Sequence, residues 1–477
     1  MNLRLLFIYG IVGTACLSAA GSEPAAIHSD TLSLSLDDCI RVALDNNPTV
    51  RIADMDITRV DYSKKETIGA LLPTISFGAT YNRMLAKQVA YMNMDAFGSP
   101  DSDNTDTETS NSKNSGRQGI KMGLDNSYSV GFQASVPLIA PQLWASLKLS
   151  DSHILQSVEQ ARASRLSLIN EIKNAYYTLL LAEDSRKVIR QSYEMAALTH
   201  DIYTRQHQAG TASDYDVLRT SVAMKNVEPE LLQSEIAIKQ ARLQLAILMG
   251  MPADIPVKPT VSLSDYESDM YADAMSLSRD YSGNTELRLN EIQIRQLSEA
   301  LRVQKMAWYP TLVASVNYNW TSSSNGSPFH NFLWSPYSVF GLTLNIPLFE
   351  GGTRYNKQQQ ARIQVEQAKI QRENIQQNVS SQVDLAIDNI LLNVRQIASS
   401  SESVQQADRA HDIMQKSFNI GAASYLDLRD SELALTQARL AYYQAIYNYL
   451  IANSSLELLL GNDSSIPSSS ATPSNIR

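Results

Sequence analysis

The stretch NTELRLNEIQIRQLSEALRVQKMAWYPTL occupies residues 284–312, and a related stretch, NPTVRIADMDITRVDYSKKETIGALLPTI, occupies 47–75. Asn47, Arg51 and Pro73 each have an identical residue 237 positions later in the chain. Self-similarity at a fixed period indicates a structural unit that is written more than once. The sequence therefore predicts two related halves, each with a helix that runs into a proline-marked strand.

The repeat continues through long stretches that lack glycine and proline. Each has 68 residues, at 142–209 and 353–420, and each is followed by a glycine, Gly210 or Gly421. These two glycines lie 211 residues apart, whereas the first matches lie 237 apart. The first half must therefore carry the longer insert, and the change of offset places that insert between paired strands.

Two repeats of the order helix, strand, strand, long helix, short helix account for most of the chain. Their predicted ranges are 34–250 and 284–461, with a connection at 251–283 and a disordered polar tail at 462–477. At about 1.5 Å per residue, a helix of 68 residues extends roughly 100 Å. No ordinary globular core has that depth, so the long helices predict a coiled-coil-like rod or tube.

The shorter helix of the second repeat distinguishes these two arrangements. One apolar row begins at Leu426 and another at Leu428, and members of each recur every seven residues. Rows offset by two residues lie on nearly opposite sides of a helix. A helix with a neighbour on each side belongs in the wall of a tube.

Four short segments alternate between apolar and polar residues. They lie at 75–82, 128–138, 311–320 and 338–348. Alternation alone also fits an ordinary sheet packed on a core. However, the segments have about the 9–11 residues that a tilted strand needs to cross a bilayer. The linkers between paired strands are polar, and the longer one, 95–118, is predicted to be a solvated loop.

The four tryptophans support strands that cross a membrane. Trp144, Trp308, Trp320 and Trp334 all lie at or near the ends of the strand segments, as in the aromatic girdles of membrane barrels. Four strands cannot close a barrel by themselves, and open edges are not tolerated in lipid. The chain must therefore associate, and the arithmetic allows either two copies with 8 strands or three copies with 12.

The N-terminus predicts export from the cytoplasm. Arg4 precedes the short apolar run LLFIYGIVGTAC, and SAAGS supplies small residues for cleavage after Ala20, which predicts a signal peptide at 1–20. Lipid attachment at Cys16 is the alternative. Cys39 is the only other cysteine, so no disulfide framework is expected. The net charge of -9 gives no indication of a nucleic-acid partner.

The sequence SYLDLRD at 424–430 contains two acids that could be a catalytic pair, a helix start or part of an assembly. Ser424 and Asp427 have the spacing of a helix capping box, and Ser213 and Asp216 repeat this pair 211 residues earlier. Capping therefore explains Asp427 and Asp216. Asp430 has an arginine, Arg219, at its repeat-related position, so capping does not explain it.

The doubled element order in an exported chain resembles the TolC family of outer-membrane efflux proteins. The resemblance lies in NNPTVRIADMDI and NTELRLNEIQI, the strand starts LLPTI and WYPTL, IPLFEGG at 346–352, and the helix turns QAGTASDYDVLRT and NIGAASYLDLRD. It implies a homotrimer whose 12-stranded β-barrel, four strands per chain, lies in outer-membrane lipid above a helical tunnel in the periplasm. Residues 251–283 would contribute to a belt around the tunnel.

The resemblance also implies partners and a gate. Periplasmic adaptor proteins and inner-membrane pumps would dock at the lower end of a passive exit duct. Asp427 and Asp430 would ring its closed mouth, where crowded carboxylates favour cations. The arginine and tyrosine that tie the family's closed state correspond here to Ala423 and Phe418, and their partner acid to Asp216. Arg429 or Arg219 could replace them.

No pattern in the sequence predicts catalysis, a cofactor or a bound metal. The six histidines are scattered, and His200 and His207, seven residues apart, have no accompanying cysteine. The glycines lack phosphate-loop spacing. The predicted function is the outer-membrane channel of a tripartite efflux or type I secretion system. The alternative is an exported coiled-coil structural or adhesive envelope protein without a pore. The sequence specifies neither the cargo nor the pump class.

Overall fold

The computed structural model describes residues 32–92, 118–252, 257–268, 270, 277–327 and 333–462. The expected signal peptide with Cys16, all but the last residue of the expected loop 95–118, and all but the first residue of the tail 462–477 lie outside these ranges.

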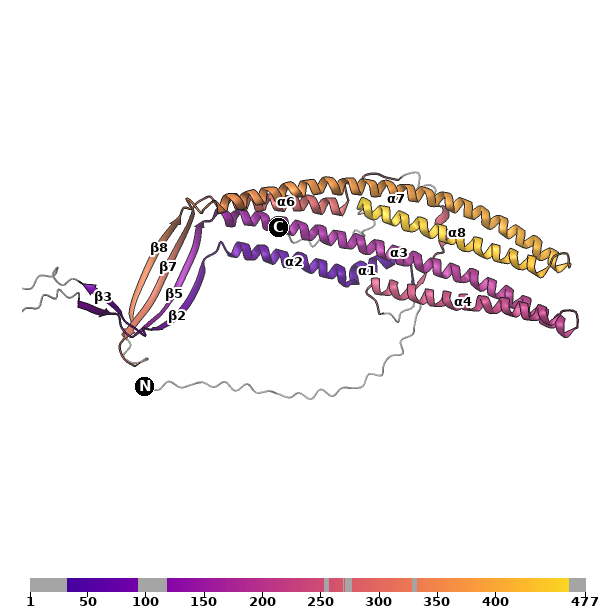
Figure 1. The fold of residues 1–477 in the computed structure, drawn as a ribbon, viewed down its shortest axis with the longest axis horizontal. Coiled ribbons are helices and arrows are strands. Elements are labelled where there is room, and N and C mark those ends of the chain that lie inside the picture. Colours follow the sequence, from indigo (N-terminus) through magenta and orange to yellow (C-terminus); the bar gives the residue numbers. More distant parts are fainter. Residues whose placement is uncertain are drawn as a thin grey trace, which may run out of the picture.

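Long helices and a four-stranded sheet make up most of an elongated molecule (Figure 1). The helices are α1 (Leu36–Asn46), α2 (Pro48–Gly69), α3 (Pro141–Gln208), α4 (Asp214–Leu248), α6 (Thr285–Met306), α7 (Thr353–Asn419) and α8 (Tyr425–Leu460). α3 has 68 residues and α7 has 67, and both lie within one residue of the predicted bounds. The predicted long helices are therefore confirmed.

The helices form two similar sets. α4 packs along α3, and α8 packs along α7. α2 and α6 lie in line with α4 and α8 respectively, so each long helix has two shorter helices beside it (Figure 1). α3 also packs extensively on α6 and α8, the helices of the second set. Within the described ranges, α7 has no comparable packing on α2 or α4.

Matching asparagines join the shorter helices end to end. The Asn47 side chain accepts a hydrogen bond from the Thr49 amide at 2.7 Å and donates to the Leu248 carbonyl at 2.7 Å. Asn284 donates in the same way to the Leu459 carbonyl at 2.8 Å. Each asparagine thus caps the start of one helix and satisfies the end of another, which accounts for its presence in both repeats.

The four predicted strands form one antiparallel sheet of order β2–β5–β7–β8. Its strands are β2 (Thr74–Arg83), β5 (Asn126–Ile139), β7 (Thr311–Ser324) and β8 (Ser335–Asn345). Phe77 pairs with Phe132, Phe132 with Tyr318, and Val316 with Phe340. This register places the predicted apolar positions of all four strands on one face, because residues paired across a ladder point the same way.

That apolar face is not covered by the described part of the chain. Ile75 is 75% exposed, Phe340 67% and Leu344 58%. Apolar side chains of this size are normally buried when they alternate along a strand. Within the described part of the chain, the sheet is therefore not packed on a core of its own.

Two features of the strands differ from the prediction. The expected segment 338–348 ends as β8 at Asn345, since Pro347 has no amide hydrogen to extend the ladder. Among the described residues, four further strands lie outside the large sheet, so the predicted count of four per chain was incomplete. β3 (Gln88–Met92) pairs with β4 (Gln118–Met122) in the insert of the first repeat, and β1 (Leu32–Leu34) pairs with β6 (Val257–Pro259).

The main core lies midway along the helices, where the connection between the repeats packs. Its largest fully buried side chains include Ile172, Tyr176, Leu179, Leu245, Leu263, Ile390, Ile446 and Tyr449. Asp184 of α3 is 2% exposed and accepts hydrogen bonds from the Ser262 hydroxyl at 2.9 Å and the Leu263 amide at 3.0 Å. The segment around η2 (Leu263–Tyr266) is thereby fixed to α3.

Candidate functional site

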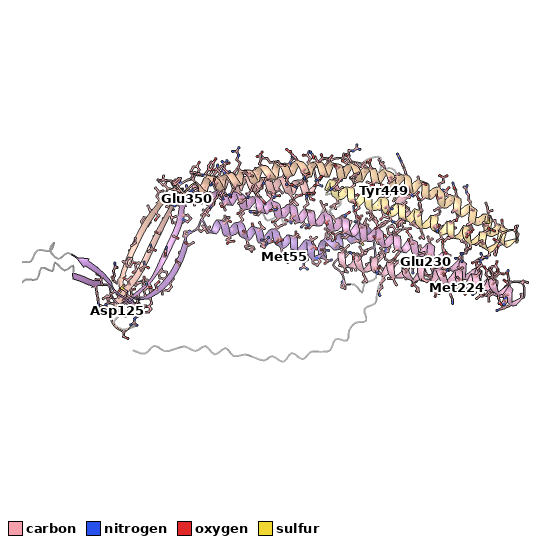
Figure 2. All side chains as sticks on the ribbon, viewed as in Figure 1. Met55, Asp125, Met224, Glu230, Glu350 and Tyr449 are labelled. Carbon is pink, nitrogen blue, oxygen red and sulfur yellow. The ribbon has the colours of Figure 1, made fainter. Side chains whose placement is uncertain are left out.

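The sheet and the helix turns lie at opposite ends of the molecule (Figure 1). Asp125 marks the end of the sheet farthest from the helices, and Glu350 lies where the sheet meets them (Figure 2). The turns at the other end join α3 to α4 and α7 to α8. Among the described residues, no helix is long and apolar enough to cross a membrane. The exposed apolar face of the sheet and the two turns are therefore the candidate sites.

The two turns have the same backbone. Gly210 has φ 76° and Gly421 has φ 75°, a left-handed conformation that glycine adopts without steric cost. The Thr211 amide donates to the Gln206 carbonyl at 2.9 Å, and the Ala422 amide donates to the Ser417 carbonyl at 2.8 Å. These bonds across six residues form a Schellman motif at each helix end, so the turn glycines have the structural role that the sequence predicted.

The acids next to the turns cap the following helices. The Asp427 carboxylate accepts hydrogen bonds from the Ser424 hydroxyl at 2.7 Å and from the Ser424 amide at 3.0 Å. Asp216 accepts the same pair from Ser213 at 2.7 and 3.3 Å. The Ser424 hydroxyl and amide hold the pKa of Asp427 below its ordinary value. The predicted capping boxes are confirmed.

Asp430 and its repeat-related arginine have different surroundings. Asp430 is exposed, and within the described chain its carboxylate has no hydrogen-bond or ion-pair partner. The Arg219 guanidinium lies over the Tyr425 ring, with 5.1 Å from its central carbon to the ring centroid. Arg219 is on α4 and Tyr425 on α8, so this cation–π contact joins the two hairpins.

An aromatic cluster surrounds that contact. The Tyr203 ring of α3 lies 5.6 Å from the Tyr425 ring, in an edge-to-face arrangement, and 6.5 Å from the Phe418 ring. Burial raises the pKa of the Tyr203 hydroxyl, and the nearby Asp216 carboxylate raises it further. Three helices from both repeats therefore meet at Tyr203. Aromatic pairs in such arrangements stabilise a structure modestly beyond the contribution of the apolar area that they bury.

Phe418 and Arg219 were predicted from the sequence as candidates, whereas Tyr203 and Tyr425 were not. A signal for Tyr425 was available, because its repeat-related residue is Asp214. Arg429, the other candidate for a tie between the hairpins, is half-buried beside Glu432 of its own helix. Burial raises the pKa of Glu432, and the Arg429 charge partly offsets this. Of the two arginines, Arg219 is the one that contacts the other hairpin.

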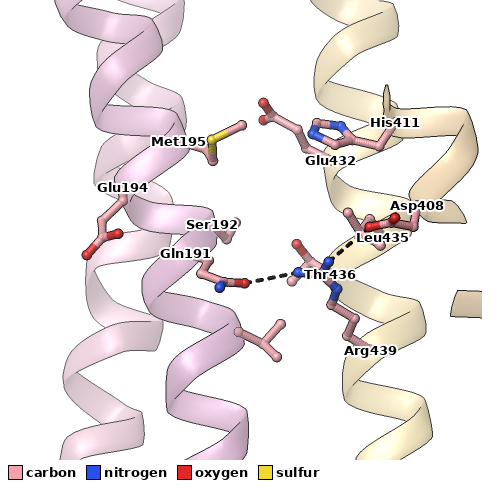
Figure 3. A pocket seen from close by; sticks show the side chains of 11 residues that line it. Gln191, Ser192, Glu194, Met195, Asp408, His411, Glu432, Leu435, Thr436 and Arg439 are labelled. Carbon is pink, nitrogen blue, oxygen red and sulfur yellow. Dashed lines mark hydrogen bonds and ion pairs between the residues drawn. The ribbon is translucent and has the colours of Figure 1, made fainter. Parts of the chain in front are cut away.

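A cleft of about 330 Å³ separates the hairpins farther from the turns (Figure 3). Its lining includes Glu194 and Met195 of α3, His411 of α7 and Glu432 of α8. Arg439 crosses the cleft floor, donating to Gln191 Oε1 at 3.0 Å and to Asp408 Oδ1 at 3.0 Å. Above the turns, the two hairpins thus contact each other through polar side chains around open space.

The tryptophans fall at two levels of the sheet. Trp144 follows β5 and Trp308 precedes β7, both at the end near the helices. Trp320 lies late in β7 and Trp334 just before β8, both toward the far end. Trp320 packs edge-on against Tyr318, with ring centroids 4.5 Å apart. No group of acidic, histidine and cysteine side chains that could hold a metal ion occurs among the described residues.

An exposed apolar sheet joined to helices roughly 100 Å long is the architecture of a membrane channel protein. Comparison with known proteins identifies the class more closely. The model of the outer membrane efflux protein family matches residues 39–251 and 278–462. The chain belongs to this family, and it is an outer-membrane channel of tripartite efflux or secretion.

Individual relatives have low identity but extensive coverage. The chain is 23% identical to the pyoverdine export outer membrane protein OpmQ of Pseudomonas aeruginosa, over 73% of this chain and 74% of OpmQ. It is 22% identical to the outer membrane protein TolC of Escherichia coli, over 72% and 74%. The CmeC outer membrane channel of Campylobacter jejuni superposes with a TM-score of 0.68 at 17% identity, covering 89% of this chain and 85% of CmeC. The resemblance to the TolC family is confirmed.

Proposed function

We propose that three copies of the chain form a closed duct, with a 12-stranded barrel in the outer membrane and a helical tunnel in the periplasm. The observation that carries this proposal is the large sheet, which has an exposed apolar face and two unpaired edge strands, β2 and β8. Open edges cannot remain in lipid, where no water satisfies their backbone groups. Three four-stranded sheets give an even-numbered antiparallel barrel of ordinary size.

The strand directions support edge-to-edge closure. β2 begins at the helices and runs away from them, whereas β8 returns toward α7 (Figure 1). The β8 of one copy would therefore be antiparallel to the β2 of the next. The polar face of the sheet, with Ser76, Gln133, Asn317 and Thr343, would line the interior.

The helices support the same arrangement independently. α3 packs on α6 and α8 of the other repeat, but α7 has no such neighbours among the described helices. Because the repeats are alike, the corresponding face of α7 is free to receive α2 and α4 of a second copy. Exposed apolar side chains such as Ile363, Ile370 and Leu385 lie on α7. A ring of alternating repeats would cover them.

The two turns form the gate in this proposal. Asp427 and Asp430 of three copies would form a ring at the lower mouth, and Asp216, Phe418 and Arg429 would lie near it. The Arg219–Tyr425 contact supports a closed state in which each chain's hairpins are held together. A periplasmic adaptor and an inner-membrane pump would dock nearby, and residues 251–283 would form part of a belt.

The relatives do not identify the cargo. Their names refer to pyoverdine export, alkaline protease secretion and cobalt-zinc-cadmium resistance. Chemically unrelated cargoes are thus associated with one fold, so the driving pump must be identified for this chain directly. We expect it to co-purify with the cross-linked protein.

Two adjacent residues on β8 test the barrel. Phe340 lies on the apolar face and Val339 on the polar face. An arginine on the lipid side of a barrel costs about 2–4 kcal/mol at mid-bilayer, whereas one on the interior is tolerated. Phe340→Arg should sharply reduce the outer-membrane trimer, measured by native mass and heat-modifiable mobility in detergent. Val339→Arg should leave it intact. A monomer without strand signal in circular dichroism would support the pore-free envelope protein instead.

Single-channel conductance tests the gate. Asp430→Asn should reduce cation selectivity and block by divalent ions in planar bilayers, because it removes three charges from the proposed ring. Asp388→Asn is the matched control, since it removes an exposed acid from α7 far from the turn. If both variants behave like the parent channel, Asp430 is not at the constriction.

A further inference from the structure

The end of α3 carries a histidine whose two ring nitrogens both face acceptors. His207 Nδ1 lies 3.1 Å from the Ala212 carbonyl oxygen, and Nε2 lies 3.1 Å from Asp214 Oδ1. Ala212 is in the turn and Asp214 begins α4. The imidazole therefore spans the whole turn from the last residues of one helix to the first residue of the next.

A neutral imidazole can satisfy only one of these two acceptors. It carries a proton on one nitrogen, and the other nitrogen is itself an acceptor. An imidazolium donates from both nitrogens and adds an ion pair with Asp214. We propose that protonation of His207 fastens the first turn, so that this turn is an acid-strengthened clasp while the second turn is not.

The second turn lacks both side chains of the clasp. The positions related to His207, Ala212 and Asp214 by 211 residues are Phe418, Ala423 and Tyr425. Phe418 and Tyr425 pack around Tyr203 instead. Neither ring changes charge near neutral pH, because a phenol titrates near pH 10.

Two other histidines near the turns make equivalent contacts, one in each repeat. His200 Nδ1 lies 3.1 Å from the Thr220 hydroxyl, and His411 Nδ1 lies 3.3 Å from the Ser431 hydroxyl. These two pairs are related by the same 211 residues. Because their contacts are equivalent, they do not distinguish the two turns, whereas His207 does.

Several charged groups lie near His207 at this turn. On its own helix, Arg205 is paired with Asp201, and on α4 the nearby groups are Asp214, Asp216 and Arg219. Asp216 accepts the capping hydrogen bonds of Ser213, and Arg219 lies over Tyr425. Asp214 is thus the carboxylate that ion-pairs with His207.

The sign of the pH dependence follows from the bound proton. The closed turn offers an acceptor to each nitrogen of the imidazolium, so in this proposal the extra stability is present at acid pH and is lost at alkaline pH. His207 is 43% exposed and Asp214 89% exposed, so the contribution is that of a surface pair. In the proposed duct, acid would stiffen one of the two turns that each chain presents at the mouth.

Amide hydrogen exchange on the full chain in detergent tests this directly. The Thr211 and Ala422 amides make the equivalent turn hydrogen bonds, so each reports on one turn. After correction for intrinsic exchange, protection of Thr211 should fall about two- to fivefold from pH 5 to pH 8, the size expected for an exposed ion pair. Ala422 should not change. His207→Gln, which keeps one donor, and Asp214→Asn should both abolish the difference.

Each other outcome would overturn the clasp. Protection of Thr211 that is independent of pH, or that changes in parallel with Ala422, would contradict it. So would a pH dependence that survives His207→Gln. The measurement concerns one turn of the folded chain. It can therefore contradict the clasp even if the three-copy duct is correct, and it can support the clasp even if the duct is wrong.

Discussion

The turn between α3 and α4 and the turn between α7 and α8 have the same length, the same left-handed glycine and the same serine–aspartate cap. Several of their side chains differ, and three of these differences bear on the contacts at the turns. His207, Asp214 and Arg219 in the first repeat stand where the second has Phe418, Tyr425 and Asp430. The shared residues build a helical hairpin, which both repeats need. The differing residues make each chain present one polar and one aromatic turn.

The difference also shows how the hairpins hold each other. Arg219 from the polar turn reaches Tyr425 of the aromatic turn, and Tyr203 packs against the same ring. The two residues are not repeat-related, since Arg219 corresponds to Asp430 and Tyr425 corresponds to Asp214. The hairpins are therefore joined through side chains that the two repeats do not share.

The largest expected effect comes from removing the ring at the centre of this contact. Tyr425→Ala should destabilise the start of α8 by about 2–3 kcal/mol, since it removes edge-to-face packing, a cation–π contact and apolar area. The repeat-related change, Asp214→Ala, should cost about 0.5 kcal/mol because that side chain is exposed. The Leu428 and Val217 amides report on these two helix starts by hydrogen exchange.

Equal effects of Tyr425→Ala and Asp214→Ala would contradict the predicted difference between the two turns. If Tyr425→Ala and Asp214→Ala loosened their helices by the same amount, the aromatic cluster would contribute nothing beyond the helix start itself. A large effect of Tyr425→Ala on the Val217 amide as well would mean that the two hairpins open together.

A smaller effect should be the same in both turns. Gly210→Ala and Gly421→Ala should each cost about 1 kcal/mol, because a side chain raises the energy of the left-handed conformation. A Cβ at either position would meet no other atom within 4 Å, so conformation is the only cost. Protection of the Thr211 and Ala422 amides from hydrogen exchange measures this cost at each turn. Costs that differ by more than about 0.5 kcal/mol would show that the turns are not equivalent in backbone.

Much of this fold could be predicted from the sequence because its signals are periodic. The absence of glycine and proline over 142–209 and 353–420 set the long helices to within one residue. Alternation in the strands predicted which side chains share a face, since register follows from a period of two. The serine–aspartate spacing predicted both caps. Each of these signals lies within a single element.

The contacts that depend on two elements could not be predicted in this way. Nothing in the sequence places Tyr203, Arg219 and Tyr425 together, because they are brought close only by the packing of α3, α4 and α8. The β3–β4 hairpin was missed because its strands are short and lie in a polar insert. The segment around Leu263 was expected only as a connection, and its hydrogen bonds to Asp184 follow from tertiary structure.

The smallest predicted effect concerns Asp427. It distinguishes a role of this residue in helix capping from a role in the gate. The Ser424 hydrogen bonds lower the pKa of this carboxyl from its ordinary value of 3.8. A lowered pKa in the folded state means that the charged cap stabilises the turn above that value, and the contribution is lost as the pH falls through the lower folded value. Protection of the Leu428 amide should therefore decrease only in strong acid, and Asp427→Asn should remove this dependence.

Asp430→Asn is the control for the cap, because Asp430 is exposed and makes no capping hydrogen bond. It should leave the acid dependence of the Leu428 amide unchanged, although it should alter conductance. The cap is expected to weaken in acid, whereas the proposed His207 clasp is expected to strengthen. A single titration of both turns can thus assign each change to one residue. Loss of Leu428 protection near neutral pH would mean that Asp427 responds to neighbouring carboxylates rather than to Ser424.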